Sequence, residues 1–102
     1  MYIVHSTFEI PHLDKVDEVI DIYKNRSRLV DHASGFVQFQ LLQNQKKPNF
    51  LTVQLTWETR EDYMRWVTSD DYRKIHELEK KYPDQELAAI VPRVDQFQVV
   101  AT

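Results

Sequence analysis

The chain has 102 residues, of which 42% are hydrophobic and 28% charged, a balance that predicts one globular domain over residues 1–102. Its formal charge of −3 leaves no excess of basic side chains for a phosphate backbone, so nucleic acid is excluded as an expected partner. The absence of cysteine excludes disulfides, thiolate nucleophiles and thiolate-held zinc or iron–sulfur clusters.

Membrane insertion and secretion are not expected either. No stretch approaches the roughly 18 consecutive apolar residues of a membrane span. The first ten residues alternate like a strand and lack the charged start and apolar core of a secretory signal. We therefore expect a cytoplasmic protein with no membrane partner, whose candidates for chemistry are histidines, carboxylates and aromatic side chains.

The first third of the chain is predicted to form a strand and a long helix. Apolar residues alternate over 2–10 until Pro11 ends the run, and they recur at three- and four-residue steps over 13–30. Gly35, the only glycine, is expected at the turn that follows, because glycine takes left-handed backbone angles without strain.

A hairpin is expected next. Strands over 36–43 and 50–58 flank a polar segment in which Pro48 marks a turn. One side of the second strand carries its apolar residues, which are Leu51, Val53, Leu55 and Trp57. This row should face the helices.

Helix-start signals predict two short helices after the hairpin. Thr59 and Asp62 resemble a capping pair, and Ser69 before Asp70 marks a second start. Because one start follows so closely on the other, a kink is expected between the two helices.

The chain is expected to end with a connection and a strand. The second short helix should stop at about Lys81, before Pro83, with a connection over 82–92 and a fourth strand over 93–100. The order strand, helix, hairpin, helix pair, strand is the split β-α-β arrangement of an α+β ferredoxin-like fold, with helices on one face of the sheet.

The other face of the sheet is expected to be bare. If the apolar row from Leu51 to Trp57 faces the helices, the other face would carry the apolar residues Ile3, Val37, Phe39, Leu41 and Phe97. An apolar patch on a small protein usually marks an association surface. The sequence therefore predicts a homodimer formed sheet on sheet.

Residues suited to chemistry concentrate in the segment 57–76, which holds two tryptophans, two tyrosines and a histidine. Tyr72 and His76 are four residues apart and share one face of the second short helix. A histidine beside large apolar rings can present a nitrogen to a metal, but a half-buried histidine more commonly completes the edge of a core. Both interpretations of His76 stay open on these grounds.

The same segments resemble the antibiotic biosynthesis monooxygenase superfamily. The resemblance is carried by Phe36 to Leu42, Leu51 to Trp57, Trp66, Ser69, Asp70, Tyr72 and His76, and by Asn25 to Asp31 followed by Gly35. It covers nearly the whole chain and implies a dimeric α+β barrel.

Within that superfamily, Trp66, Ser69, Asp70 and His76 most resemble the IsdG-type haem-degrading monooxygenases. The resemblance implies that His76 ligates the haem iron and that Trp66 presses on the porphyrin, with Tyr72 beside them in the haem pocket. It also implies that haem is substrate and cofactor together, that an external donor supplies electrons, and that ring opening releases iron.

The first strand departs from this family at one site residue. The family's pocket asparagine, which donates a hydrogen bond to the distal ligand, corresponds to Ser6, or to Thr7 if the alignment shifts by one. The Ser6 hydroxyl is expected in the pocket, where it reaches less far than an amide. The alternative is a hydrogen bond from this hydroxyl to neighbouring backbone.

Two other functions stay open. A cofactor-independent monooxygenase of quinol or polyketide aromatics would use Tyr72, Trp66 and His76 only to shape and polarise its substrate. A non-catalytic haem-binding protein is favoured by the serine at position 6.

The remaining candidates are expected to be structural. Trp57 ends its strand on the inward row, and Trp66 has the same alternative role as a core residue. Three histidines share no metal-binding spacing and are expected at the surface: His5, His12 and His32. Four cations are expected to pair with carboxylates on a solvated face: Arg26, Arg28, Lys46 and Lys47.

Overall fold

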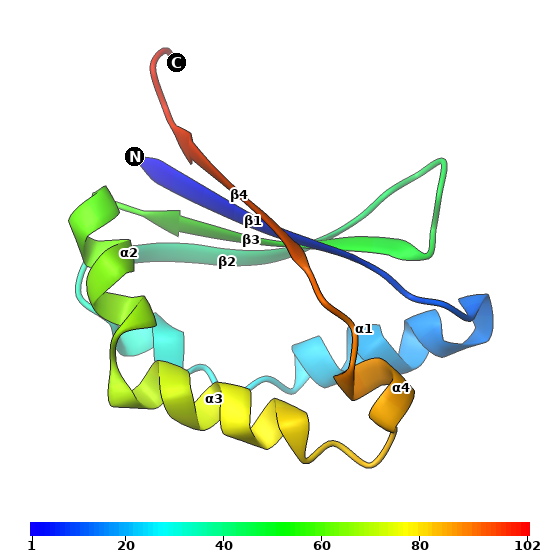
Figure 1. Ribbon diagram of the computed structural model, residues 1–102. Helices are drawn as coiled ribbons and strands as arrows, with labels where there is room; N and C mark the ends of the chain where they lie inside the picture. Colours follow the sequence, from blue (N-terminus) through cyan, green and yellow to red (C-terminus); the bar gives the residue numbers. More distant parts are fainter.

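The computed structural model describes all 102 residues and forms a four-stranded antiparallel sheet with helices on one face (Figure 1). Its strands are β1 (Tyr2–Glu9), β2 (Phe36–Gln43), β3 (Phe50–Trp57) and β4 (Arg93–Gln98). They lie in the order β2-β3-β1-β4, and every neighbouring pair is antiparallel. The α+β ferredoxin-like fold predicted from the sequence is thereby confirmed.

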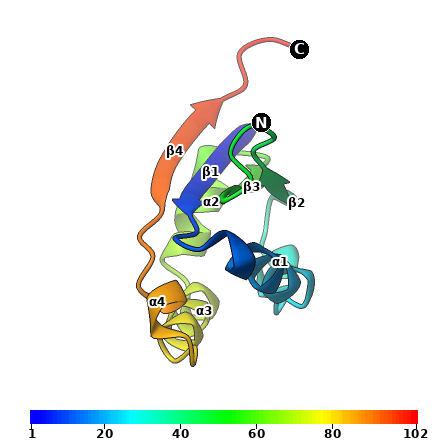
Figure 2. The same cartoon turned by 90° about the vertical axis from the view of Figure 1, so that its right-hand side faces the viewer.

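Two helices lie on one face of the sheet, α1 (Val16–Lys24) and α3 (Asp70–Lys80), and Figure 2 shows that they are apart from each other. Helix α2 (Arg60–Val67) lies at one end, and the short α4 (Gln85–Ala88) follows α3. The opposite face of the sheet carries no helix. None of the helices has the length and apolar character needed to cross a bilayer.

Both predicted helix starts are confirmed. The Thr59 hydroxyl accepts a hydrogen bond from the Asp62 backbone N–H, and the Ser69 hydroxyl accepts one from that of Tyr72. Each cap satisfies an N–H group that has no partner within its helix. The chain therefore bends sharply between α2 and α3, and the rings of Trp66 and Tyr72 meet across the bend at 6.0 Å.

The first helix is shorter than predicted. Helix α1 ends at Lys24, and the chain continues irregularly to the 3₁₀ helix η2 (Leu29–His32). Arg28, whose φ of 61° is left-handed, keeps η2 from joining α1 as one right-handed helix. Val30 still reaches the core, but it does so from η2. The helical spacing of Val30 from the apolar residues before it therefore predicted a longer helix than the one that forms.

A β-bulge in β2 overturns part of the predicted face assignment. The register with β3 shifts between Phe36 and Gln38, which makes Val37 an extra residue. As a result, Phe39 and Leu41 turn toward the helices and do not join the bare face. The apolar patch expected there is correspondingly smaller.

Two clusters of buried side chains join the sheet to the helices. The first contains Tyr2, Val4, Val30, Trp57 and Trp66, and the second contains Ile10, Val16, Val19 and Leu51. Trp57 is fully buried, which supports the structural role predicted for it.

Gly35 is constrained twice at the turn before β2. Its φ is 78°, and a Cβ atom at this position would lie 2.1 Å from the Asp62 carboxyl carbon. Asp62 cannot easily move, because it is buried and bonded to the Thr59 cap. The turn and the start of α2 therefore pack together only if residue 35 has no side chain.

We expect Gly35→Ala to lower the free energy of unfolding by about 2–5 kcal/mol, since left-handed strain costs roughly 1–2 and overpacking roughly 1–3. Urea unfolding followed by circular dichroism measures this change. Ser34→Ala, at the exposed neighbouring position, should change it by less than about 0.5 kcal/mol. Equal losses in the two variants would contradict the constraint.

Candidate functional site

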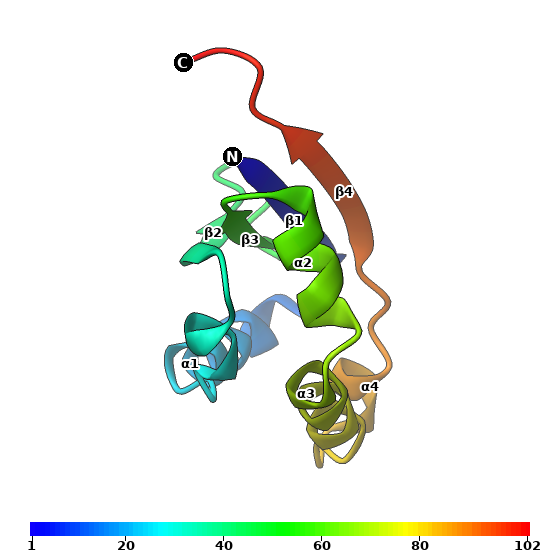
Figure 3. The same cartoon turned by 90° about the vertical axis from the view of Figure 1, so that its left-hand side faces the viewer.

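A cavity of about 540 Å³ lies between the sheet and the helices beneath it. Its lining includes residues of β1, β2, β3 and all four α-helices, and Figure 3 shows α1 and α3 standing apart on the same side of the sheet. The volume falls within the range of roughly 300–1,000 Å³ typical of small-molecule sites. Because 19 of the 27 lining residues are hydrophobic, the cavity suits a largely apolar ligand.

All four predicted site residues line this cavity: Ser6, Trp66, Tyr72 and His76. They come from β1, α2 and α3, which are far apart in the sequence. The fold therefore brings the predicted constellation to one place.

His76 lies at the rim of the cavity, and its side chain is 47% exposed. Its ring meets the edge of the Tyr72 ring with 4.2 Å between centroids. Its Nδ1 atom is 3.4 Å from a carboxylate oxygen of Glu79, while Nε2 has no partner within the chain. The imidazole is thus more open than an inner-face position implies, and its Nε2 is available to a ligand.

Trp66 is a core residue, as the alternative prediction for it states, and it also reaches the cavity. It is only 8% exposed and packs against Trp57 and Tyr72, with ring centroids 6.4 and 6.0 Å away. It also forms part of the cavity wall. A rigidly packed indole at this position can press on a flat ligand without yielding.

Ser6 lies where β1 pairs with its two neighbours, opposite Val53 and Val94. Ser6 belongs to the cavity lining, and no hydrogen bond of its hydroxyl is present within the chain. The alternative of a bond to neighbouring backbone is therefore not realised, and the hydroxyl is free to meet a ligand.

Tyr23 is a cavity residue that sequence reasoning missed. Its ring packs between Phe8 and Phe39, at 6.0 and 6.1 Å between centroids. Burial, with the Glu79 carboxylate as a lesser cause, raises the pKa of Tyr23 to about 12. The hydroxyl stays protonated at neutral pH. In the sequence, Tyr23 was counted only as an apolar residue of the helix. Its hydroxyl was the feature that could have identified it as a cavity residue.

Glu79 is the second residue that was missed. It lines the cavity on α3, and its carboxylate adds to the effect of burial in raising the pKa of Tyr72. Its position three residues after His76 places both on one helix face, and this spacing could have identified it.

A second, polar hollow of about 330 Å³ lies along α3, beside the first. Arg73 and Lys80 line it, and it shares Tyr72 and His76 with the larger cavity. His76 is therefore reachable from both hollows, and the polar one presents cations beside it.

The chain supplies a single imidazole at the site. No group of three or more histidine or carboxylate side chains is placed to hold a metal ion. Of the other histidines, His5 bonds to Gln54 at 2.7 Å, and His12 pairs with Glu86 at 2.8 Å. One imidazole suits an iron whose other ligands come from a porphyrin.

Arg26 also lines the cavity but is engaged in structure. Its guanidinium donates two hydrogen bonds to Asp31, at 2.8 and 3.2 Å, and lies 4.0 Å from the centre of the Phe39 ring. The predicted charge pair of Arg26 forms, but the solvated face expected for it was wrong, because the Arg26 side chain is only 18% exposed and both Arg26 and Arg28 line the cavity.

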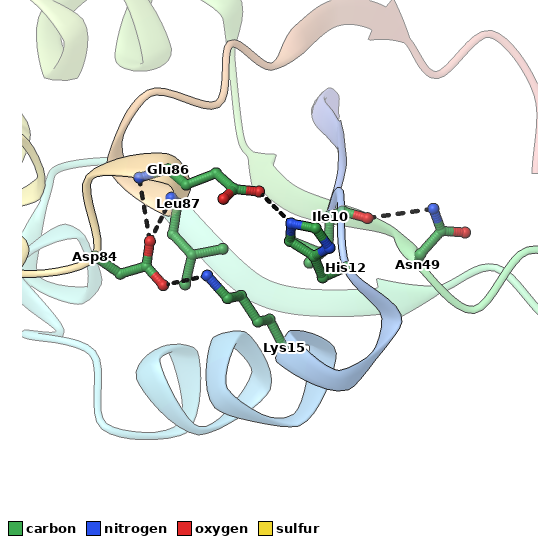
Figure 4. Close-up of polar contacts among 7 residues, drawn as sticks. All are labelled: Ile10, His12, Lys15, Asn49, Asp84, Glu86 and Leu87. Atoms are coloured by element: carbon green, nitrogen blue, oxygen red, sulfur yellow. Dashed lines mark hydrogen bonds and ion pairs between the residues drawn. The ribbon is translucent and has the colours of Figure 1, made fainter.

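The segment around α4 closes one end of the cavity with Leu87, Ala88, Ile90 and Pro92. It was predicted as a packed connection, and the short helix within it was not. Figure 4 shows how it is attached: Lys15 pairs with Asp84 at 2.7 Å, close to the His12–Glu86 pair. Asp84 also caps α4 by accepting bonds from the N–H groups of Glu86 and Leu87.

The family model described as antibiotic biosynthesis monooxygenase matches residues 1–78. The chain belongs to the antibiotic biosynthesis monooxygenase family. The matched residues include all four predicted site residues, whereas α4 and β4 lie beyond them. No curated protein matches the sequence.

Solved structures similar to this family member include proteins with different chemistries. The heme-degrader MhuD from Mycobacterium tuberculosis, with two hemes bound in its active site, has a TM-score of 0.79 and 20% identity, covering 100% of this chain and 98% of its own. SnoaB, a cofactor-independent oxygenase from Streptomyces nogalater, has a TM-score of 0.75 and 14% identity, covering 99% and 94%. Both likenesses show the fold.

The Asp84 attachment has a pH signature. The hydrogen bond from Lys15, with those from the α4 backbone, lowers the pKa of Asp84 below its ordinary 3.8. The folded chain is therefore stabilised above that pH, and the stabilisation is lost as the pH falls through the lowered value. We expect Asp84→Asn, which keeps a capping side chain, to melt at a lower temperature than wild type at neutral pH.

This difference in melting temperature should close in acid, as thermal unfolding followed by circular dichroism at several pH values can show. Glu61→Gln, at an exposed position, is the control for loss of one carboxylate. A difference for Asp84→Asn that stays constant from neutral to acid pH would exclude the ion pair as its source.

Proposed function

We propose that this family member is a haem-degrading monooxygenase, which binds haem through His76 and opens the porphyrin with electrons from an external donor. One observation carries the proposal: an imidazole with a free Nε2 stands at the rim of an apolar cavity that Trp66 and Ser6 also line. Monooxygenase activity is the family's chemistry.

The residues present fit a haem. The cavity is mostly apolar, as a tetrapyrrole face requires, and a neutral imidazole is a common axial ligand of haem iron. The hollow that holds Arg73 and Lys80 adjoins His76, so the carboxylates of a haem would meet cations there. When bound, haem supplies the iron that activates oxygen and the porphyrin that is consumed.

Three residues have separate roles in this proposal. His76 holds the iron through Nε2, and Trp66, supported from behind by Trp57, presses on the porphyrin face. Ser6 offers a hydroxyl as the hydrogen-bond donor on the cavity side of β1. Because a hydroxyl is shorter than the family's asparagine amide, turnover depends on how closely the haem approaches β1.

A second function is favoured by Tyr23. A protonated phenol inside an apolar cavity can hold the oxygen of a quinol or polyketide aromatic, and such a substrate needs no iron. In that case, Tyr72, Trp66 and His76 shape and polarise the substrate. The likeness to SnoaB, described as cofactor-independent, supports this alternative.

A third function is haem binding without catalysis, and Ser6 is the observation that favours it. If its hydroxyl is too short to act on the distal ligand, the complex would form and persist. Restoring the amide with Ser6→Asn should then create turnover.

We also propose that the chain works as a homodimer formed through the bare face of the sheet. Ile3 and Phe97 are paired neighbours on that face, and Phe97 is 47% exposed. The polar side chains around them bond to one another, His5 to Gln54 and Gln54 to Gln40. Burying polar groups that are already paired costs little, so a second sheet can cover this face.

Haem titration tests the proposed activity. Wild type mixed with haemin should give a ligated Soret band, and His76→Ala should weaken binding more than roughly tenfold, since even outer partners of a metal ligand contribute roughly 10–100-fold. His32→Ala, an exposed histidine outside the cavity, should leave the band unchanged. Reductant and air should then bleach the wild-type complex and release iron.

The same assay separates the three functions. A stable complex that reductant and air leave intact, with turnover gained in Ser6→Asn, identifies a haem-binding protein. Oxidation of an aromatic substrate without haem identifies the cofactor-independent enzyme. If His76→Ala binds haem as wild type does, the role assigned to His76 is wrong.

Sedimentation velocity tests the dimer. Phe97→Asp places a charge on the bare face at the edge strand β4 and should convert a dimer into a monomer while circular dichroism stays unchanged. Leu13→Asp, at a 66% exposed site on the helix side, should leave the dimer intact. A wild-type monomer, or equal dissociation in both variants, would rule out this interface.

A further inference from the structure

The carboxylate of Glu79 has His76 as its only ion-pair partner. Its Oε2 atom lies 3.4 Å from Nδ1 of the imidazole, and both residues project from the same face of α3. Lys80 is the next residue in the chain, yet it forms no ion pair with Glu79 within 4.0 Å. The carboxylate is therefore within ion-pair distance of the imidazole, and no other cation competes for it.

The position of the single proton decides how a neutral imidazole can act. Whichever ring nitrogen carries the proton cannot ligate iron, and the other nitrogen keeps the lone pair. A carboxylate only accepts hydrogen bonds, so Glu79 favours the form with the proton on Nδ1. That form leaves the lone pair on Nε2, the nitrogen with no partner in the chain.

The residues around His76 restrict the orientation of its imidazole ring. Tyr72 holds the imidazole ring edge to face at 4.2 Å, which limits rotation about the side-chain bonds. Glu79 also lies close enough to Tyr23 to raise the pKa of that phenol further than burial does alone. Glu79 also lines the cavity, and its carboxylate contacts the Nδ1 side of the imidazole, across the ring from the proposed ligating Nε2.

We propose that Glu79 is a positioning residue for His76: it accepts the Nδ1–H hydrogen bond and so makes Nε2 the ligating nitrogen. The inference rests on the proposed haem function. An anionic acceptor also increases the electron donation of the imidazole, which stabilises ferric over ferrous iron.

The first experiment uses the chain without haem. Heteronuclear NMR of the imidazole nitrogens at alkaline pH gives the tautomer ratio of His76. In Glu79→Ala the proportion with the proton on Nδ1 should fall. In Glu77→Ala, an exposed carboxylate of the same helix outside the cavity, the ratio should match wild type.

The second experiment uses the haem complex. Glu79→Ala should bind haemin roughly 10-fold more weakly and shift the ferric/ferrous midpoint potential to a more positive value, whereas Glu77→Ala should do neither. A merely structural role for Glu79 would change the melting temperature and leave the potential where it is.

The two experiments fail separately. If wild type binds no haem, the proposed function falls, and the tautomer ratio still decides whether Glu79 orients His76. If wild type binds haem but Glu79→Ala keeps both the tautomer ratio and the potential of wild type, the positioning role is overturned and the haem function stands.

Discussion

A continuous row of aromatic contacts holds the site in place. It starts at the fully buried Trp57 of β3 and passes through Trp66 and Tyr72 to His76, with centroid distances of 6.4, 6.0 and 4.2 Å. Packed rings have few alternative positions, so the rigidity of the core extends to a half-exposed residue at the rim. The capped bend at Ser69 is what allows the row to pass from α2 to α3.

The cavity owes its shape to two irregularities of the backbone. The bulge at Val37 turns Phe39 inward, where it stacks on Tyr23. The left-handed Arg28 separates η2 from α1, and η2 delivers Val30 to the core. Together they place an aromatic wall opposite α3 and leave space between the two helices.

One fold here serves more than one chemistry. MhuD, described as a heme-degrader, and SnoaB, described as a cofactor-independent oxygenase, resemble the chain to a similar degree. The backbone therefore does not select the reaction. In our proposal, selection falls to a few side chains around the cavity: an imidazole at the rim, a hydroxyl on β1, a phenol on α1 and a carboxylate that orients the imidazole.

The sequence alone determined the features that depend on near neighbours. Alternation along β3, the caps at Thr59 and Ser69 and the left-handed turn at Gly35 are local, because each is decided within a few residues. The placement of Ser6 and His76 in the lining of one cavity, and the exposure of that histidine, were decided only by the tertiary structure. They depend on strand register and on packing between distant segments, which no local pattern encodes.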